Sequence, residues 1–228
     1  MAETWHLLQS GPRAATYNMA LDNAFLDLAP QLGQPILRFY SWTEPAASFG
    51  YFQKFAEIAH ATSLRPLVRR PTGGGLVPHD ADWTYSLVFP PLHPWYLVKA
   101  GQSYRRLHEW LQASFARMGA QTELSPGTLK EIPGQCFAGS ERFDLLRQGQ
   151  KIAGAAQRRT RTGLLIQGSI QPGNLRASRD DWQQAMCDEA QAKWGVDWVP
   201  FEIDPCLEET IERLAGEKYS KIDYTERR

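Results

Sequence analysis

The sequence predicts an α+β fold: a single domain over residues 1–228 with a central, mostly antiparallel sheet flanked by helices. Three observations lead to this prediction. Segments rich in β-branched and aromatic residues cluster in the middle of the chain. Segments with apolar residues at helical spacing lie on either side of them. The connections between the strand-like segments are short, which favours antiparallel pairing, because a parallel crossover needs a dozen or more residues.

The flanking segments carry helical patterns and recognisable helix ends. The expected helices cover residues 15–29, a segment that begins at Ser103, and two segments packed on the domain near 179–193 and 205–216. Pro30 and Gly33 are expected to end the first helix. Asp204 is the expected N-cap of the last helix, with Pro205 at its first helical position.

The middle of the chain contains the strand patterns. The expected strands cover residues 36–42, 45–53, 66–72, 83–90 and 163–170, together with a hairpin over residues 143–159. The hairpin is expected to turn near Gln148-Gly149, because these residue types tolerate the backbone of a tight turn.

The composition is that of an ordinary globular protein, with 43% apolar and 22% charged residues. A net charge of zero argues against general binding to nucleic acid or to anionic membranes. The sequence has no segment of membrane-spanning length and no signal-peptide pattern. Its three cysteines are widely spaced, which excludes a disulfide framework and a cysteine-rich zinc site. We therefore expect a soluble, cytoplasmic protein without a bound metal.

The most unusual segment is RRPTGGGLVPHD, residues 69–80. Three glycines indicate either a tight turn or a close approach of the backbone to a ligand. The segment matches neither the dinucleotide fingerprint nor the P-loop. Successive glycine N–H groups suit an anion or oxyanion, and arginine suits a carboxylate or phosphate. Side chains alternate along a strand, so only one of Arg69 and Arg70 should face a pocket, while the other packs or lies on the surface.

This segment resembles the Arg-Arg-x-Ser/Thr-Gly-Gly-Gly-x-Val-x-His-Asp signature of the lipoate–protein ligase and octanoyltransferase family. KIAGAAQRR (151–159) resembles the second signature of the family, and NMALDNAFL (18–26) and PAASFGYFQ (45–53) resemble its first helix and early strands. The resemblance covers residues 15–175. It implies a fold similar to the biotin/lipoate protein ligase catalytic domain, which is class II aminoacyl-tRNA synthetase-like.

The resemblance also implies a substrate site and a chemical centre. The implied substrate-binding residues are Arg70, Gly73, Gly74, Gly75, Leu76, Val77, His79, Gly154 and Ala155. Lys151, the only lysine between Lys130 and Lys193, is implied to contact the acyl carboxyl or thioester group. Without the resemblance, a solvated lysine after a hairpin turn is the favoured interpretation. The small residues after Lys151 fit either an extended acyl chain or close packing of a helix.

Cys136 lies in GQCFAGSERFDLL, which resembles the segment around the acyl-carrying cysteine of the cysteine-dependent octanoyltransferases, the branch that this chain resembles most. A nearby Lys151 would lower the thiol pKa from its ordinary value of about 8.5. Taken alone, Cys136 is better explained as a small buried hydrophobic residue, and the surrounding pattern favours the nucleophile. Cys187, in a helix among acidic residues, is expected to pack. Cys206, near a helix N-terminus, is a weaker candidate nucleophile.

Three functions remain open from the sequence. The first is octanoyl transfer through a Cys136 thioester, from octanoyl-acyl carrier protein to a lysine of a lipoyl domain (glycine cleavage H protein or 2-oxoacid dehydrogenase E2), which requires no cofactor. The second is an ATP-dependent lipoate–protein ligase, which requires ATP and Mg. The third is a non-catalytic protein that binds an acyl group or a lipoyl domain.

The position of the chain end bears on the choice between transferase and ligase, and two residues depart from the family pattern. The chain ends soon after the last expected strand, so no accessory ligase domain is expected. Gln167 stands where the family often has histidine, and Pro78 stands where it usually has an aromatic or similar residue. If that histidine serves in proton transfer or in placing the acceptor lysine, its role falls to another residue or is lost. His79 is a candidate, although a lone histidine near a loop is more often structural.

Overall fold

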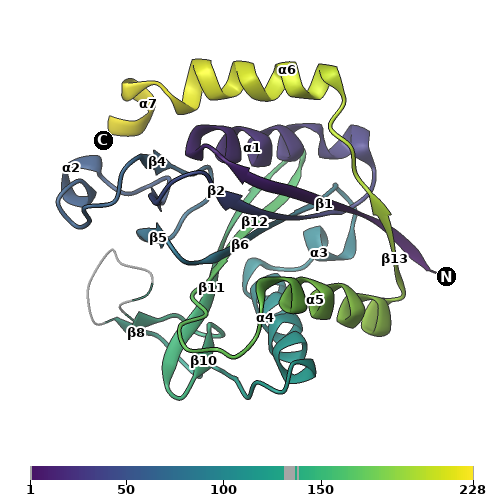
Figure 1. The fold of residues 1–228 in the computed structure, drawn as a ribbon. Coiled ribbons are helices and arrows are strands. Elements are labelled where there is room, and N and C mark those ends of the chain that lie inside the picture. Colours follow the sequence, from purple (N-terminus) through teal and green to yellow (C-terminus); the bar gives the residue numbers. More distant parts are fainter. Residues whose placement is uncertain (1, 131–136, 138, 228) are drawn as a thin grey trace.

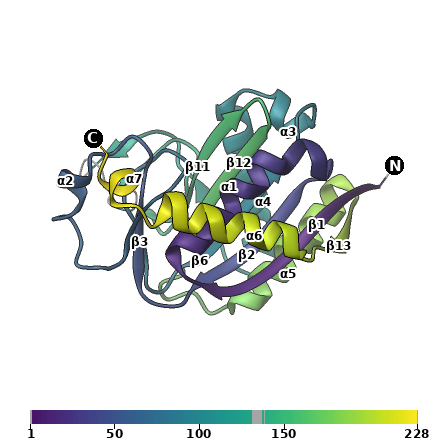
Figure 2. The same ribbon diagram turned by 90° about the horizontal axis from the view of Figure 1, so that it is seen from above.

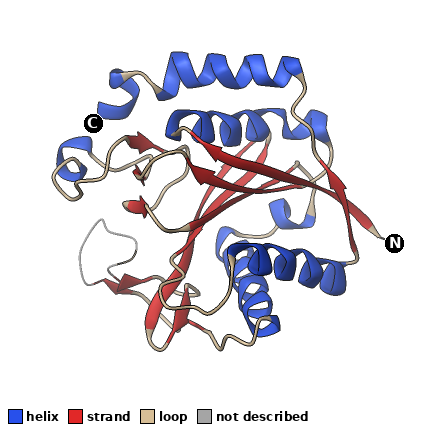
Figure 3. Ribbon diagram, viewed as in Figure 1, coloured by secondary structure: helices blue, strands red, loops and turns tan. Residues whose placement is uncertain are grey.

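A computed structural model of the chain describes residues 2–130, 137 and 139–227. Its main element is a sheet of strand order β13-β1-β2-β6-β12-β11-β10-β7. These strands are β1 (Glu3–Arg13), β2 (Ile36–Trp42), β6 (Trp83–Phe89), β7 (Glu123–Leu124), β10 (Leu145–Arg147), β11 (Gln150–Thr160), β12 (Gly163–Ile170) and β13 (Val196–Pro200). Figure 3 shows this sheet crossing the whole molecule.

Helices cover both faces of the main sheet (Figure 1). The long helices are α1 (Ala15–Leu32), α4 (Ala100–Arg117), α5 (Arg179–Trp194) and α6 (Pro205–Leu214); the short ones are α2 (Phe55–Ile58), α3 (Pro94–Leu97), α7 (Ile222–Glu226) and a π-helical turn, Ala215–Tyr219. Helix α1 covers one face, and α6 lies across α1 as an outer layer (Figure 2). Helices α4 and α5 cover the other face. None of the helices in the described part of the chain has the length and apolar character needed to span a membrane.

The expected antiparallel sheet is confirmed from β2 to β7, where every neighbouring pair is antiparallel. The sequence analysis missed β1 and β13. Strand β1 pairs in parallel with both β2 and β13, and helix α1 forms the crossover between β1 and β2. The sheet is therefore mixed, and short connections predicted only its antiparallel part.

Strand β2 shows why the central strands have no solvent-exposed face. Leu37 and Phe39 pack in the core under α4 and α5, whereas Ile36 packs in the core under α1. Arg38 also faces α1, and its guanidinium lies 2.7 Å from the carboxylate of Asp22. A strand covered on both faces is buried along its length, so it lacks the alternation of a half-exposed strand.

Among the expected helix-end residues, Gly33 and Asp204 are confirmed, whereas Pro30 and Ser103 are wrong. Gly33, with φ of 68°, ends α1, whereas Pro30 lies inside its last turn. Asp204 caps α6 by accepting a hydrogen bond from the Leu207 N–H. The expected start at Ser103 is wrong, because α4 begins at Ala100.

A small second sheet, of order β4-β3-β5, lies beside the main sheet. It consists of β3 (Ala46–Phe49), β4 (Leu67–Arg69) and β5 (Val77–His79), so the expected strands 45–53 and 66–72 are shorter than predicted. A two-stranded ribbon, β8 (Leu129–Lys130) with β9 (Gly139–Ser140), lies near the β10–β11 hairpin. Together these elements surround a cavity.

Candidate functional site

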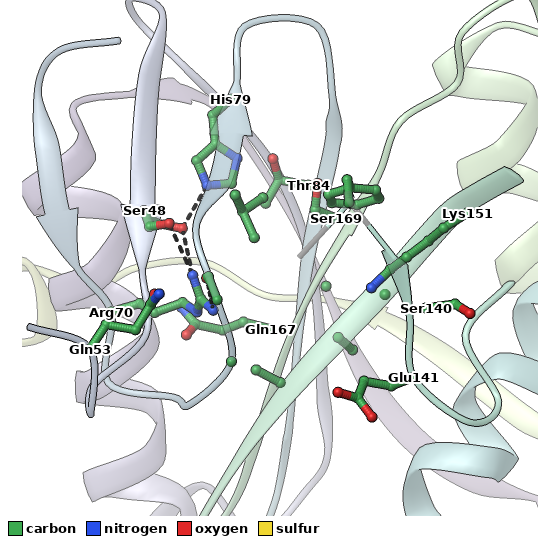
Figure 4. Close-up of a pocket in the computed structure, with 18 of the residues that line it drawn as sticks. Ser48, Gln53, Arg70, His79, Thr84, Ser140, Glu141, Lys151, Gln167 and Ser169 are labelled. Carbon is green, nitrogen blue, oxygen red and sulfur yellow. Dashed lines mark hydrogen bonds between the residues drawn. The ribbon is translucent and has the colours of Figure 1, made fainter. Parts of the chain in front are cut away.

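The cavity lies between the small sheet and strands β11 and β12, and it has a volume of about 380 Å³. Figure 4 shows Ser48, Arg70 and His79 on one side, and Ser140, Glu141 and Lys151 on the other. Its apolar lining residues are Met19, Trp42, Val77, Leu129, Phe137, Ala155 and Ala156. A concave, mainly apolar site with a few converging polar groups is typical of a small-molecule site.

Lys151, at the start of β11, extends its side chain to this cavity (Figure 4). Its ammonium lies 2.7 Å from the Asp144 carboxylate, and the two side chains are 7% and 0% exposed. The ammonium also lies 5.1 Å from the centre of the Phe137 ring. The interpretation of Lys151 as a solvated lysine after a turn is therefore wrong: it is a buried cation beside a cavity.

The backbone around Lys151 explains how a strand residue reaches this position. Lys151 and Ala153 pair with consecutive residues of β10, so a bulge occurs at this point of the ladder. Bulges redirect side chains next to functional sites. The lysine stem then crosses Gly154, where a Cβ atom would lie 2.7 Å from Cε and 2.9 Å from Nζ of Lys151. Position 154 therefore favours glycine, because the Lys151 side chain occupies the space that a Cβ atom would fill.

Asp144 is held by several donors besides Lys151. The Glu141 N–H donates to its Oδ2 atom at 2.6 Å, and the Tyr104 hydroxyl of α4 donates to its Oδ1 atom. Burial, followed by the Asp144 charge, raises the pKa of Tyr104 well above its ordinary value. Tyr104 therefore remains a neutral donor that fixes the carboxylate facing Lys151.

The glycine run forms a loop whose carbonyl groups are held by Arg70. The Arg70 guanidinium donates to the carbonyl oxygens of Gly73 and Gly75, each at 2.7 Å from Nη2, and to the Ser48 carbonyl at 3.1 Å. Gly74 has φ of 84°, which favours glycine. A Cβ atom on Gly50 would overlap the Gly74 carbonyl oxygen. The run therefore serves both purposes foreseen for glycine, a turn and a close approach of two backbone segments.

Arg69 and Arg70 point in different directions, as strand alternation predicts. Arg69 is fully buried and donates to the carbonyl oxygens of Tyr224, Thr225 and Arg227 in and beside α7. Only Arg70 lines the cavity. The prediction that one of the two arginines packs is confirmed for Arg69.

His79, on β5, belongs to a chain of three hydrogen-bonded side chains in the cavity wall. Its Nε2 atom lies 2.8 Å from the Ser48 hydroxyl, and its Nδ1 atom lies 2.8 Å from the Asp82 carboxylate. The imidazole is buried and stacks on the Trp42 ring, with 4.0 Å between ring centres. His79 is therefore held in one orientation by its neighbours on both sides.

Gln167, on β12, occupies the position where a histidine was expected from the resemblance. Its amide oxygen accepts from the Thr72 hydroxyl at 2.8 Å, and its amide nitrogen donates to Asp22 at 2.7 Å. The side chain thus joins the glycine loop to the buried Asp22–Arg38 pair. An amide at this position bridges two polar groups but does not accept a proton.

The cavity brings together most of the residues named from the sequence. Arg70, Gly74, Gly75, Val77, His79, Lys151, Gly154 and Ala155 line it. Leu76 does not, because it packs against β3 in a separate apolar cluster with Ala47 and Phe49. Gly73 is also absent from the lining; its carbonyl meets Arg70. Cys136 lies outside the described residues.

Several lining residues were missed by the sequence analysis. They are Ser48, Trp42, Thr84, Tyr104, Ser140, Glu141 and Ser169. Ser48 offered a signal, because a lone polar residue in the apolar strand AASF requires a buried partner. Asp82 offered another, since it lies three residues after His79.

The remaining cysteines differ in environment. Burial, followed by the charge of Asp188, raises the pKa of Cys187 to about 12, which agrees with its expected packing role. Cys206 is exposed in the first turn of α6. Over residues 2–130, 137 and 139–227, no group of three or more histidine, cysteine, aspartate or glutamate side chains is arranged to hold a metal ion.

Comparison with known proteins agrees with this architecture. Residues 14–186 match the family model of the lipoyl protein ligase A/B catalytic domain. The chain is 35% identical over 181 residues to octanoyltransferase LipM of Halalkalibacterium halodurans, and 34% identical over 184 residues to that of Staphylococcus aureus. These matches cover 74% and 75% of this chain. They span 66% of each relative, slightly less than two thirds of its length.

Solved structures show the same fold. The chain superposes on lipoate-protein ligase A bound with ATP with a TM-score of 0.80, at 21% identity and with 99% of each chain covered. It superposes on a bi-partite lipoate protein ligase from Thermoplasma acidophilum with a TM-score of 0.77, at 19% identity, covering 99% of this chain and 97% of that one. The expected single α+β domain is thus confirmed, and the chain belongs to the lipoyl protein ligase A/B catalytic domain family.

Proposed function

We propose that the protein is an octanoyltransferase that transfers an octanoyl group from acyl carrier protein to a lysine of a lipoyl domain, through a thioester on Cys136. The observation that carries this proposal is the buried Lys151 ammonium beside an apolar cavity. A fixed cation at the end of such a cavity suits the carbonyl of an acyl chain, whose oxygen becomes negative during transfer. The similarity to octanoyltransferases of the LipM type supports this choice of reaction.

The cavity suits the hydrocarbon part of this substrate. Its volume of about 380 Å³ falls in the range of ligand sites, about 300–1,000 Å³. Each buried CH₂ group contributes about 0.8 kcal/mol, so an eight-carbon chain gains roughly 5 kcal/mol on entering. Apolar contacts thus supply most of the affinity, and Val77, Gly154 and Ala155 in the lining contribute to them.

In this proposal Cys136 receives the acyl group. Phe137, which is covalently joined to it, contacts the Lys151 ammonium. A thiolate near this cation is more stable than an isolated one, and each lowered pKa unit corresponds to about 1.4 kcal/mol. Lys151 would then have two roles, favouring the thiolate and polarising the acyl carbonyl.

The partners and setting belong to the same proposal. The donor is octanoyl-acyl carrier protein, and the acceptor is a lipoyl domain, either glycine cleavage H protein or a 2-oxoacid dehydrogenase E2. The donor thioester is already activated, so this reaction requires no ATP. We propose residues 1–228 as one catalytic domain acting in the cytoplasm, with α5 and α6 packed on it.

Intact-protein mass spectrometry after mixing with octanoyl-acyl carrier protein tests the proposal. Wild type and Cys206→Ser are expected to gain one octanoyl group, and Cys136→Ala to gain none. Cys206→Ser is the matched control, because this exposed thiol lies on α6. A wild type that gains no acyl group, or a Cys136→Ala variant that still gains one, contradicts the proposal.

A parallel reaction separates transfer from ligation. Wild type is incubated with octanoate or lipoate, ATP and Mg²⁺, and pyrophosphate is measured. The proposal expects none above background. Rapid pyrophosphate release together with an unmodified Cys136 would instead assign the chain to the ligases.

A further inference from the structure

The cavity contains a second acid–base system, on the wall opposite Lys151 (Figure 4). Ser48, His79 and Asp82 are hydrogen-bonded in series, with 2.8 Å between each pair of atoms. Their exposed fractions are 2%, 5% and 9%. Ser48 and His79 line the cavity, whereas Asp82 lies behind the imidazole. The arrangement resembles the chain of hydroxyl, imidazole and carboxylate that moves protons in serine hydrolases.

The chemistry of the groups fixes the direction of every hydrogen bond. An ionised carboxylate only accepts, so Asp82 accepts from His79 Nδ1–H and from the hydroxyls of Thr84 and Ser169, at 3.0 and 2.7 Å. In a neutral imidazole with its proton on Nδ1, His79 Nε2 is the acceptor and the Ser48 hydroxyl donates to it. The proton acceptor of the chain therefore faces the cavity through Ser48.

Arg70 completes this chain from the opposite side of Ser48. Its Nη1 atom donates to the Ser48 hydroxyl oxygen at 3.2 Å and to the Ser48 carbonyl oxygen at 3.1 Å. Ser48 Oγ thus accepts from a cation and donates to an imidazole. Both contacts favour loss of the hydroxyl proton toward His79.

Amide formation requires such a proton acceptor. An amine that attacks a thioester carbonyl must lose a proton from its nitrogen as the C–N bond forms. Lys151, as an ammonium, donates rather than accepts, and the Gln167 amide is not a base. We infer that the Ser48–His79–Asp82 chain accepts the proton of the attacking lysine amine, in the acyl-transfer step of the proposed function.

The step balances as follows. The amine nitrogen forms a C–N bond to the acyl carbon, and its proton passes to Ser48 Oγ while the Ser48 hydroxyl proton passes to His79 Nε2. The resulting imidazolium is compensated by Asp82. The C–S bond breaks, its electron pair leaves with the thiolate, and the imidazolium then returns its proton to the thiolate or to solvent. Ser48 touches the amine, whereas His79 and Asp82 act through it.

Other charged and titratable groups face this chain from the surrounding elements. Arg70 lies beside Ser48, and the charge of Asp82 acts on Arg179 of α5 and on Tyr40 of β2. Burial, followed by the charge of Asp22, raises the pKa of Tyr40 well above its ordinary value, although Arg38 acts in the opposite direction, so this hydroxyl stays neutral.

The test separates the two half-reactions. Enzyme acylated in advance by octanoyl-acyl carrier protein is mixed with excess lipoyl domain, and octanoyl transfer is followed in a single turnover over about pH 6 to 9. Ser48→Ala and His79→Gln are expected to acylate at rates within a few fold of wild type. Their transfer to lysine should be about 10²-fold slower near neutral pH. The defect should shrink at high pH, where solvent base removes the amine proton.

The matched control is His93→Gln. His93 is another buried imidazole paired with a carboxylate, that of Glu3 at 2.7 Å, but it lies outside the cavity. This variant should transfer at the wild-type rate. Thermal unfolding shows whether the His79 variant folds. If it folds poorly, Ser48→Ala still tests the inference, because it removes only one hydroxyl oxygen.

Two failures are distinguishable. A wild-type enzyme that does not become acylated overturns the proposed function. A wild type that becomes acylated, with Ser48→Ala and His79→Gln variants that transfer at its rate and with its pH profile, overturns only the proton-acceptor inference. An equal loss in both half-reactions also overturns it, because a purely structural role has that result.

Discussion

The ammonium of Lys151 and the carboxylate of Asp144 form an ion pair of 2.7 Å in which both side chains are nearly buried. A buried ion pair is costly to break, because loss of one partner leaves the other charged in an apolar environment. The pair therefore holds the cation at the cavity only as long as both charges are present.

We expect Asp144→Asn and Lys151→Met each to lower the free energy of unfolding by about 3 kcal/mol. Urea unfolding of the single and double variants measures this. The double variant should lose clearly less than the sum of the single losses, because neither charge then remains unpaired. Additive losses would show that the two charges do not stabilise each other.

We expect Gly154→Ala to impair acyl transfer more than folding. The added methyl group would lie 2.7 Å from Lys151 Cε and 2.9 Å from Nζ, so the flexible lysine end must move. Displacement of a catalytic group by about 1 Å can cost about 10²-fold in rate. The acylation rate measures this, and Gly101→Ala is the control, because its Cβ would meet nothing within 4 Å. An unchanged rate in Gly154→Ala would contradict the placement of Lys151.

We expect Gly50→Ala to be far more destabilising than Gly73→Ala, although Gly73 belongs to the glycine run. A Cβ on Gly50 would overlap the backbone of Gly74, whereas one on Gly73 would meet nothing within 4 Å. Overpacking of this kind costs about 1–3 kcal/mol. Thermal and urea unfolding of both variants measure the difference. Equal stability would mean that the two backbone segments do not approach closely.

We expect acid to destabilise the protein through His108. Burial lowers the pKa of this imidazole from 6.5 to about 4. The unfolded chain therefore binds the proton more tightly than the folded chain, and stability falls as the pH drops from about 6.5 to about 4. At pH 5 the loss from this group is about 2 kcal/mol. Urea unfolding at pH 7 and pH 5 should show this extra loss in wild type and not in His108→Leu; equal losses would contradict it.

Local chemistry made several elements predictable. The hairpin between β10 and β11 turns at Gln148 and Gly149, with φ of 53° and 76°, because this conformation favours such residues. Asp204 and Pro205 fixed the start of α6 in the same way. The resemblance of the signature segments to those of the family, rather than local chemistry, implied one site for Arg70, His79 and Lys151, and these residues line one cavity.

Relationships between distant segments were not predictable. Strand β1 is defined by its pairing with β13 at the opposite end of the chain, and its own Gly11 and Pro12 weaken a strand pattern. Helix α4 begins before Ser103 because the Gln102 side chain accepts from the Lys99 N–H. Asp144 was assigned to a motif, but its pairing with Lys151 depends on the bulge between β10 and β11. The contacts of Ser48 and Asp82 depend on how the small sheet packs beside the main sheet, which the sequence does not show.

Arg69 links β4, the strand before the glycine loop, to helix α7. Its guanidinium donates hydrogen bonds to five backbone carbonyl oxygens. Two of them belong to the turn after β3, and three belong to α7 and the residue after it. The next residue, Arg70, holds the glycine loop. Detachment of α7 would remove three of these acceptors from the buried Arg69 guanidinium, which is joined through the backbone to Arg70. The shape of the cavity is therefore expected to depend on the anchoring of α7, which contributes no side chain to its lining.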